Sequence, residues 1–127
     1  MADDSGTLVS SGSSLNMPTG SGSERLRRAT IHTLNADTQE ILSGTAGHIY
    51  TIISIIFCDM QEAAGSISIK LNDGSNDIQL LSEASHASKG TFVWNDRFVM
   101  EEDDDLDVYN SVTAGDWIVS YIDQDWT

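Results

Sequence analysis

The chain has 127 residues with 20 acidic and 6 basic side chains, which gives a formal net charge of −14. This length suits a single domain, and an apolar fraction of 39% is enough for a hydrophobic core. The negative charge argues against binding to nucleic acid or to an anionic membrane, and the single cysteine, Cys58, rules out an intramolecular disulfide.

The first part of the chain is predicted to be a flexible arm. Residues 1–23 contain seven serines and four glycines without any apolar periodicity. The N-terminus is polar and acidic, and no apolar run approaches the roughly 20 residues of a membrane span, so we expect a soluble chain without an export signal. We divide the sequence into an arm, residues 1–28, and one domain, residues 29–127.

The domain is predicted to be all-β, because short apolar segments alternate with turn residues at intervals of roughly 8 to 12 residues. The segment 48–58 is apolar on both alternating faces, which indicates a central strand covered on each side. Segment 90–100 is either two short strands joined at Asn95-Asp96 or one strand with a bulge there. The count of about eight strands favours a jelly-roll-like antiparallel sandwich. The other expected strands are residues 31–34, 40–43, 65–71, 78–82, 106–109 and 117–122.

No motif for catalysis or for a cofactor is found. The acidic run Glu101–Asp107 has alternate aspartates, but Val108 stands where a calcium loop needs glycine, so we expect a solvated turn with weak, unspecific cation binding at most. The three histidines are far apart in the sequence, and no nucleophile elbow or phosphate-binding loop occurs. The sequence therefore predicts no enzyme activity, no cofactor and no metal site.

Three arginines crowd together where the arm meets the domain, at Arg25, Arg27 and Arg28. Charges cancel within residues 1–30, so the whole excess of negative charge lies in residues 31–127. The arginines then have two interpretations: they fix the base of the arm to the acidic domain or lie in solvent, or they bind the carboxylates of a partner protein while the arm lies along that partner as an extended strand.

The aromatic residues also allow two interpretations. The three tryptophans could form a stacking platform for sugar rings together with three tyrosines, namely Trp94, Trp117, Trp126, Tyr50, Tyr109 and Tyr121. Alternatively, Trp117 and Tyr121, on one face of the last strand, pack inside the sandwich or along its edge. Trp126 is the penultimate residue, where a core is seldom within reach, so a neighbouring subunit is a candidate to cover it. Trp117, Tyr121 and Trp126 are thus our candidates for an oligomer interface.

About 80 of the 127 residues, from His48 to Trp126, resemble the small β-sandwich virion proteins of tailed bacteriophages. The resemblance lies in a strand like that of residues 49–55, followed by a hairpin and then by several further segments. Those segments are Gly90-Thr91-Phe92-Val93-Trp94, Phe98–Asp104, Leu106–Tyr109 and Trp117–Asp123.

The resemblance implies a non-enzymatic structural role, most directly as a decoration or cement protein on the outer surface of the capsid. It also implies a homo-oligomer, with a trimer favoured, that binds the major capsid protein or another virion protein and is soluble in the host cytoplasm before assembly. An accessory protein of the neck, tail or fibres is the alternative within the virion. A carbohydrate-binding module that uses exposed tryptophans is the alternative of another class.

Overall fold

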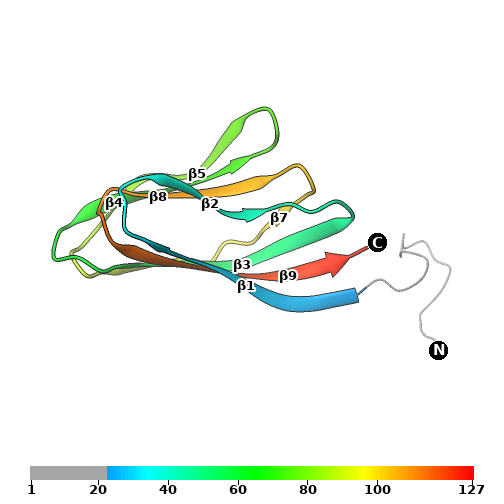
Figure 1. The fold of residues 1–127 in the computed structure, drawn as a ribbon, viewed down its shortest axis with the longest axis horizontal. Coiled ribbons are helices and arrows are strands. Elements are labelled where there is room, and N and C mark those ends of the chain that lie inside the picture. Colours follow the sequence, from blue (N-terminus) through cyan, green and yellow to red (C-terminus); the bar gives the residue numbers. More distant parts are fainter. Residues whose placement is uncertain (1–22) are drawn as a thin grey trace.

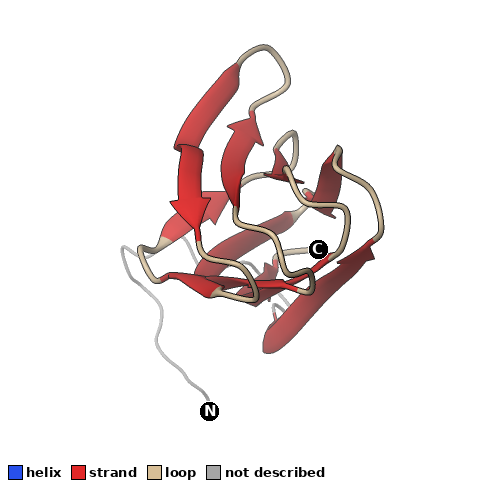
Figure 2. Cartoon of the chain, turned by 90° about the vertical axis from the view of Figure 1, so that its left-hand side faces the viewer, coloured by secondary structure: helices blue, strands red, loops and turns tan. Residues whose placement is uncertain are grey.

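The structure is a computed structural model that describes residues 23–127, so the predicted flexibility of residues 1–22 lies outside the described range. The described chain consists of strands and loops (Figure 2). Its strands are β1 (Ser23–Thr33), β2 (Thr38–Ser43), β3 (His48–Asp59), β4 (Gly65–Asn72), β5 (Asp77–His86), β6 (Thr91–Trp94), β7 (Phe98–Met100), β8 (Asp105–Asn110) and β9 (Gly115–Asp125).

The strands form two antiparallel sheets that pack face to face (Figure 1). The five-stranded sheet has the order β1-β9-β3-β6, with β7 also paired to β3, and the four-stranded sheet has the order β2-β8-β4-β5. The chain passes repeatedly from one sheet to the other, as it does in a jelly roll. The predicted all-β sandwich is therefore confirmed.

Residues 23–127 form nine strands where about eight were predicted, because segment 90–100 forms two short strands, β6 and β7, in place of one. β6 pairs with Ile55–Cys58 of β3, and β7 pairs with Tyr50–Ile52 of the same strand. The interruption lies opposite a bulge in β3, where the register of β3 against β9 shifts between Ile52 and Ser54. Segment 90–100 is thus a pair of short strands that together occupy one edge of the sheet.

The same bulge corrects the predicted faces of β3. Strict alternation would place Ser54 and Ile56 on the face of Ile52, but the extra residue turns Ile55 and Phe57 into the core instead. The prediction that both faces of β3 are covered is wrong for residues 23–127. Its outer face is only half-buried, because within residues 23–127 no strand lies over the side of the five-stranded sheet that faces away from the four-stranded sheet.

The boundary between arm and domain also differs from the prediction. β1 begins at Ser23 and pairs with β9 along its whole length, from Ser23 opposite Asp125 to Thr33 opposite Gly115. Residues 23–28 therefore belong to the sandwich and not to the arm. Their polar sequence carries no strand signal of its own. They form a strand because they pair with β9, which is distant in the sequence.

The core lies between the two sheets. β9 illustrates its origin, since alternate residues from Gly115 to Asp123 are buried while the residues between them are half-exposed. This alternation matches the prediction for the last strand. The most completely buried apolar side chains are Ile52, Ile55, Phe57, Ile67, Ile69, Met100, Leu106, Val108, Trp117 and Val119.

Candidate functional site

The three arginines of the predicted partner site lie on two different faces of β1. Arg25 and Arg27 are opposite Asp123 and Tyr121, which face the inside of the sandwich, whereas Arg28 is opposite the outward Ser120. Arg27 Nη1 lies 3.2 Å from Asp123 Oδ2, and the Asp123 side chain is only 3% exposed. Arg27 is therefore bound to the acidic domain, as the first interpretation expected, although it does so as part of β1 and not as part of the arm.

A polar cluster surrounds this ion pair at one end of the sandwich. Nδ1 of His48, on β3, lies 2.7 Å from the second carboxylate oxygen of Asp123, and its Nε2 lies 3.5 Å from Asp125 Oδ1. Because a carboxylate only accepts, Nδ1 carries the proton of the shorter contact. Hydrogen bonds from Thr127 lower the pKa of Asp125, with smaller contributions from His48 and Arg25. The cluster joins β1, β3 and β9.

Trp117 and Tyr121 are core residues of the chain itself, at 1% and 7% exposure, so their assignment to an oligomer interface is wrong. Trp117 Nε1 donates a hydrogen bond of 3.0 Å to Asn110 Oδ1, and its ring lies 4.7 Å from that of Phe57. The Tyr121 ring lies 4.9 Å from that of Tyr50, and burial raises the pKa of its hydroxyl. The packing alternative therefore holds for both.

The other two tryptophans are half-buried and sit apart from Trp117. Trp94 Nε1 donates to the backbone oxygen of Asp96 at 2.9 Å. The backbone nitrogen of Trp126 donates to Gly47 O at 2.8 Å, and its buried Nε1 has no hydrogen-bond partner among residues 23–127. With Trp117 in the core, a sugar-binding platform that includes all three tryptophans is not formed. Coverage of Trp126 by a neighbour stays a prediction.

The first part of the acidic run, Glu101–Asp104, forms the turn between β7 and β8, as expected, whereas Asp105–Asp107 belong to strand β8. The Asp104 carboxylate accepts a hydrogen bond of 2.8 Å from the backbone nitrogen of Glu101, and Asp104 N donates back to Glu101 O at 3.1 Å. The described residues hold no group of three or more acidic, histidine or cysteine side chains that could bind a metal ion. Nor does any helix within residues 23–127 have the length and apolarity to cross a membrane.

The outer face of the five-stranded sheet is a surface that sequence reasoning missed. Cross-strand register places Leu26, Ile122 and Val99 in one apolar row, together with Thr51. Leu26 is 73% exposed, and Val99 is also largely exposed. A second row runs parallel to the first and consists of Thr30, Ile118, Ile56 and Val93. We call these two rows the apolar outer face.

The apolar outer face is also nearly free of net charge. Glu24 and Asp116 are the acidic residues at the outward strand positions, and Arg28 lies between the two rows. His32 contacts the Asp116 carboxylate through Nδ1. One signal in the sequence could have revealed this face. Segment 48–58 is apolar on both alternating faces, and we had expected other parts of the chain to cover both of them.

No protein-family model matches the chain, and no curated protein matches its sequence. Its fold is similar to a solved structure described as "Bacillus endospore appendages form a novel family of disulfide-linked pili". The similarity has a TM-score of 0.52 at 13% sequence identity and covers 95% of this chain and 100% of that chain. At this identity, the likeness concerns the fold alone.

Proposed function

We propose that the chain is a non-enzymatic structural subunit that associates with further copies of itself through the apolar outer face. The assembly that we propose is a decoration layer on the outer surface of a tailed-phage capsid. The observation that carries the proposal is the pair of exposed apolar rows on an almost neutral face of a chain whose net charge is −14.

Charge favours a second copy as the occupant of this face. The carboxylates that dominate the rest of the surface repel one another when two copies approach. Two copies that meet through the apolar outer face therefore experience the least repulsion. Burial of Leu26, Val93 and Val99 at this contact stabilises the assembly by about 25 cal/mol for each Å² of apolar surface removed from water. In a cement protein, many such modest contacts add by multivalency and resist opening of the shell.

The location on a phage head rests on the resemblance of residues 48–126 to small virion proteins. In this role, residues 1–22 precede β1 as the segment that reaches the major capsid protein. Arg27 is paired with Asp123, and Arg25 lies on the same face of β1 and helps to lower the pKa of Asp125, so Arg28, on the outer face, is the arginine that we assign to contact a partner.

A surface appendage is the second candidate. The observation that favours it is the similarity in fold to the structure from endospore appendages, which that description calls disulfide-linked pili. Cys58 is half-buried at an outward position of β3, beside Thr91 and Asp116. In this alternative, the same apolar outer face joins subunits into a filament.

The mass and shape of the purified full chain distinguish these roles. Light scattering at low and moderate salt should give a multiple of the 13.8 kDa chain, and the assembly should not weaken with salt, because salt screens the repulsion between acidic copies. Trimers in electron micrographs support the decoration role, and filaments support the appendage role. A monomer in every condition overturns self-association through this face.

Charged substitutions test which face is used. Val93→Lys and Leu26→Lys should convert the assembly to monomers while the fold is kept, since both side chains are exposed. Ile78→Lys on β5 is the matched control, because Ile78 is 45% exposed and Val93 is 48% exposed. If assembly survives Val93→Lys but is lost with Ile78→Lys, the interface lies on the four-stranded sheet and not on the apolar outer face.

Deletion of residues 1–22, which leaves β1 whole, should abolish binding to phage heads stripped of their decoration protein.

A further inference from the structure

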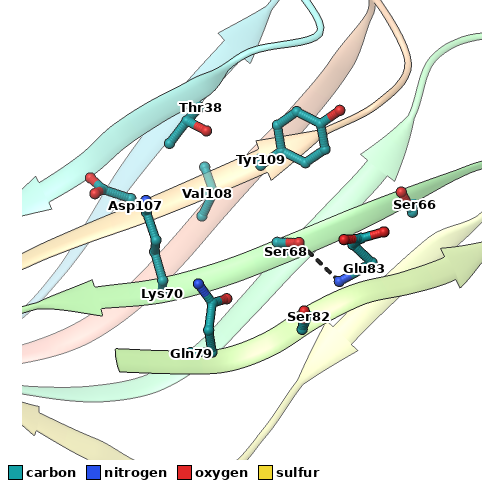
Figure 3. A pocket seen from close by; sticks show the side chains of 10 residues that line it. All are labelled: Thr38, Ser66, Ser68, Lys70, Gln79, Ser82, Glu83, Asp107, Val108 and Tyr109. Atoms are coloured by element: carbon teal, nitrogen blue, oxygen red, sulfur yellow. Dashed lines mark hydrogen bonds between the residues drawn. The ribbon is translucent and has the colours of Figure 1, made fainter. Parts of the chain in front are cut away.

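The outer face of the four-stranded sheet contains a polar groove with a volume of about 430 Å³ (Figure 3). This volume lies within the range of about 300–1,000 Å³ that is usual for small-molecule sites. Its floor is formed by side chains on the two central strands, Asp107 and Tyr109 on β8 and Ser66, Ser68 and Lys70 on β4. β5 and β2 flank it on either side.

A bulge in β5 shapes one wall. The register between β4 and β5 shifts between Ile67 and Ile69, so that Ser82 and Glu83 lie opposite Ser68. Glu83 has a φ of 47°, which is uncommon for a residue other than glycine, and its backbone nitrogen donates to Ser68 Oγ at 2.9 Å. Bulges of this kind bend a strand and redirect its side chains. The β4–β5 hairpin stands away from the sandwich at the top of Figure 2.

The lining groups are arranged in two rows across the sheet. Asp107, Lys70 and Gln79 are successive cross-strand partners on β8, β4 and β5. Tyr109 is opposite Thr38 of β2 on one side and Ser68 of β4 on the other. One row therefore supplies a carboxylate, an ammonium and an amide, and the other supplies hydroxyls around an aromatic ring.

We propose that this groove binds a neutral carbohydrate. Each sugar hydroxyl both donates and accepts a hydrogen bond, which matches a lining of carboxylate, amide, ammonium and hydroxyl groups. Planar groups such as those of Asp107 and Gln79 can engage two neighbouring hydroxyls at once, and the Tyr109 ring offers an apolar face to the C–H groups of a pyranose.

Other ligand classes fit this lining less well. Asp107 and Glu83 leave the groove with one more acidic than basic side chain, which disfavours nucleic acid and acidic sugars. An extended peptide would need free backbone groups, but the floor strands β8 and β4 already pair with a strand on both sides. The groove is also on the opposite sheet from the apolar outer face, so binding here is independent of self-association.

Saturation-transfer NMR on the full-length chain provides the direct test. The probes are the methyl glycosides of glucose, galactose, mannose and N-acetylglucosamine, with sialic acid and a trilysine peptide as comparisons. We expect transfer to at least one neutral glycoside and none to sialic acid. Absence of transfer to all four neutral glycosides, on the monosaccharides and on a glycan array alike, overturns the proposal, and so does a preference for trilysine.

Substitutions locate the binding. Tyr109→Ala and Gln79→Ala should each weaken the binding of the best glycoside, by roughly tenfold for the tyrosine, while circular dichroism shows an unchanged fold. Trp94→Ala, on the other sheet, is the matched aromatic control and should leave the affinity unchanged. If Trp94→Ala abolishes binding and Tyr109→Ala does not, the sugar site is elsewhere. The monomeric Leu26→Lys variant should keep its affinity, which separates this result from the assembly test.

Discussion

Arg27 and Asp123 form an ion pair of 3.2 Å between the edge strand β1 and the central strand β9. The carboxylate of Asp123 is almost fully buried and also contacts His48 Nδ1 at 2.7 Å. A buried charge that loses a partner is not resolvated, so the pair matters more for stability than an exposed pair does.

Arg27→Met should lower the free energy of unfolding by about 1–3 kcal/mol in urea titrations followed by circular dichroism. Lys89→Met is the control, because it breaks a pair of 3.1 Å, with Glu62, in which both side chains are exposed. That control should change stability by less than about 0.5 kcal/mol. Equal effects of the two substitutions would contradict the role assigned to Asp123.

Glu40→Gln should raise the melting temperature at pH 7. Glu40 is exposed, but slight desolvation in the folded chain raises its pKa, and repulsion from Asp105 and from Asp107, its direct cross-strand partner, raises it further. A folded-state pKa above the usual 4.5 means that ionisation opposes folding, and this destabilisation disappears as the pH falls through the raised pKa. The advantage of the variant should therefore vanish in acid, which thermal melts between pH 7 and pH 4 would detect.

Asp73→Ala should behave in the opposite way. Backbone hydrogen bonds from Asn76 and Ser75 lower the pKa of Asp73. The ionised carboxylate therefore stabilises the turn between β4 and β5 above the usual pKa of 3.8, and this stability is lost as the pH falls through the lowered pKa. The variant should melt earlier than the wild type at pH 7 and draw level in strong acid. A pH-independent difference would indicate a purely steric effect.

Trp117→Phe should cost about 2–5 kcal/mol, because it creates a cavity and leaves the buried Asn110 Oδ1 without its donor. Trp94→Phe loses an indole hydrogen bond of similar length, to Asp96 O, at a half-buried position and should cost far less. Denaturant unfolding followed by far-ultraviolet circular dichroism compares the two without relying on tryptophan fluorescence. Similar losses would argue against a structural role for the Trp117–Asn110 contact.

Gly115→Ala should destabilise the fold by about 1–3 kcal/mol, since a Cβ there would contact the ring of Phe57, with Cζ at 2.8 Å. Phe57 is fully buried, so its ring has little freedom to move. A double-mutant cycle with Phe57→Leu measures the contact, and the double variant should lose less than the sum of the single losses. If the two losses of stability are strictly additive, the strain caused by Gly115→Ala does not come from contact with the Phe57 ring.

The all-β sandwich could be predicted because alternation and turn residues are local signals. The expected strands at residues 65–71, 78–82 and 117–122 were predicted correctly for that reason, and they correspond to β4, β5 and β9. The bulge at Ile53 and the start of β1 at Ser23 could not be predicted, because both depend on register against β9, which is distant in the sequence. Patterns within a strand do not reveal which strand will lie beside it.

The candidate sites were harder to predict than the fold. The arginine cluster was visible as a charge run, but alternation along β1 separates Arg28 from Arg25 and Arg27, which no composition argument shows. Trp117 was visible as an aromatic residue, yet its burial depends on Phe57 and Asn110 from other strands. The polar groove collects residues from four strands, one from β2 and three from each of β4, β5 and β8, so their proximity is not visible in the linear sequence.

The pairing of β1 with β9 also determines the order in which the domain can form. Gln124 and Glu24 share a hydrogen bond although 100 positions separate them, and β9 lies between β1 and β3 in the sheet. During synthesis, β1 therefore has no partner until β9 has left the ribosome, and the four-stranded sheet has all of its strands before then. Folding should be slow, as is usual for proteins whose contacts are distant in sequence. Until β9 has been synthesised, β1 is unpaired and is the segment to which a chaperone would bind.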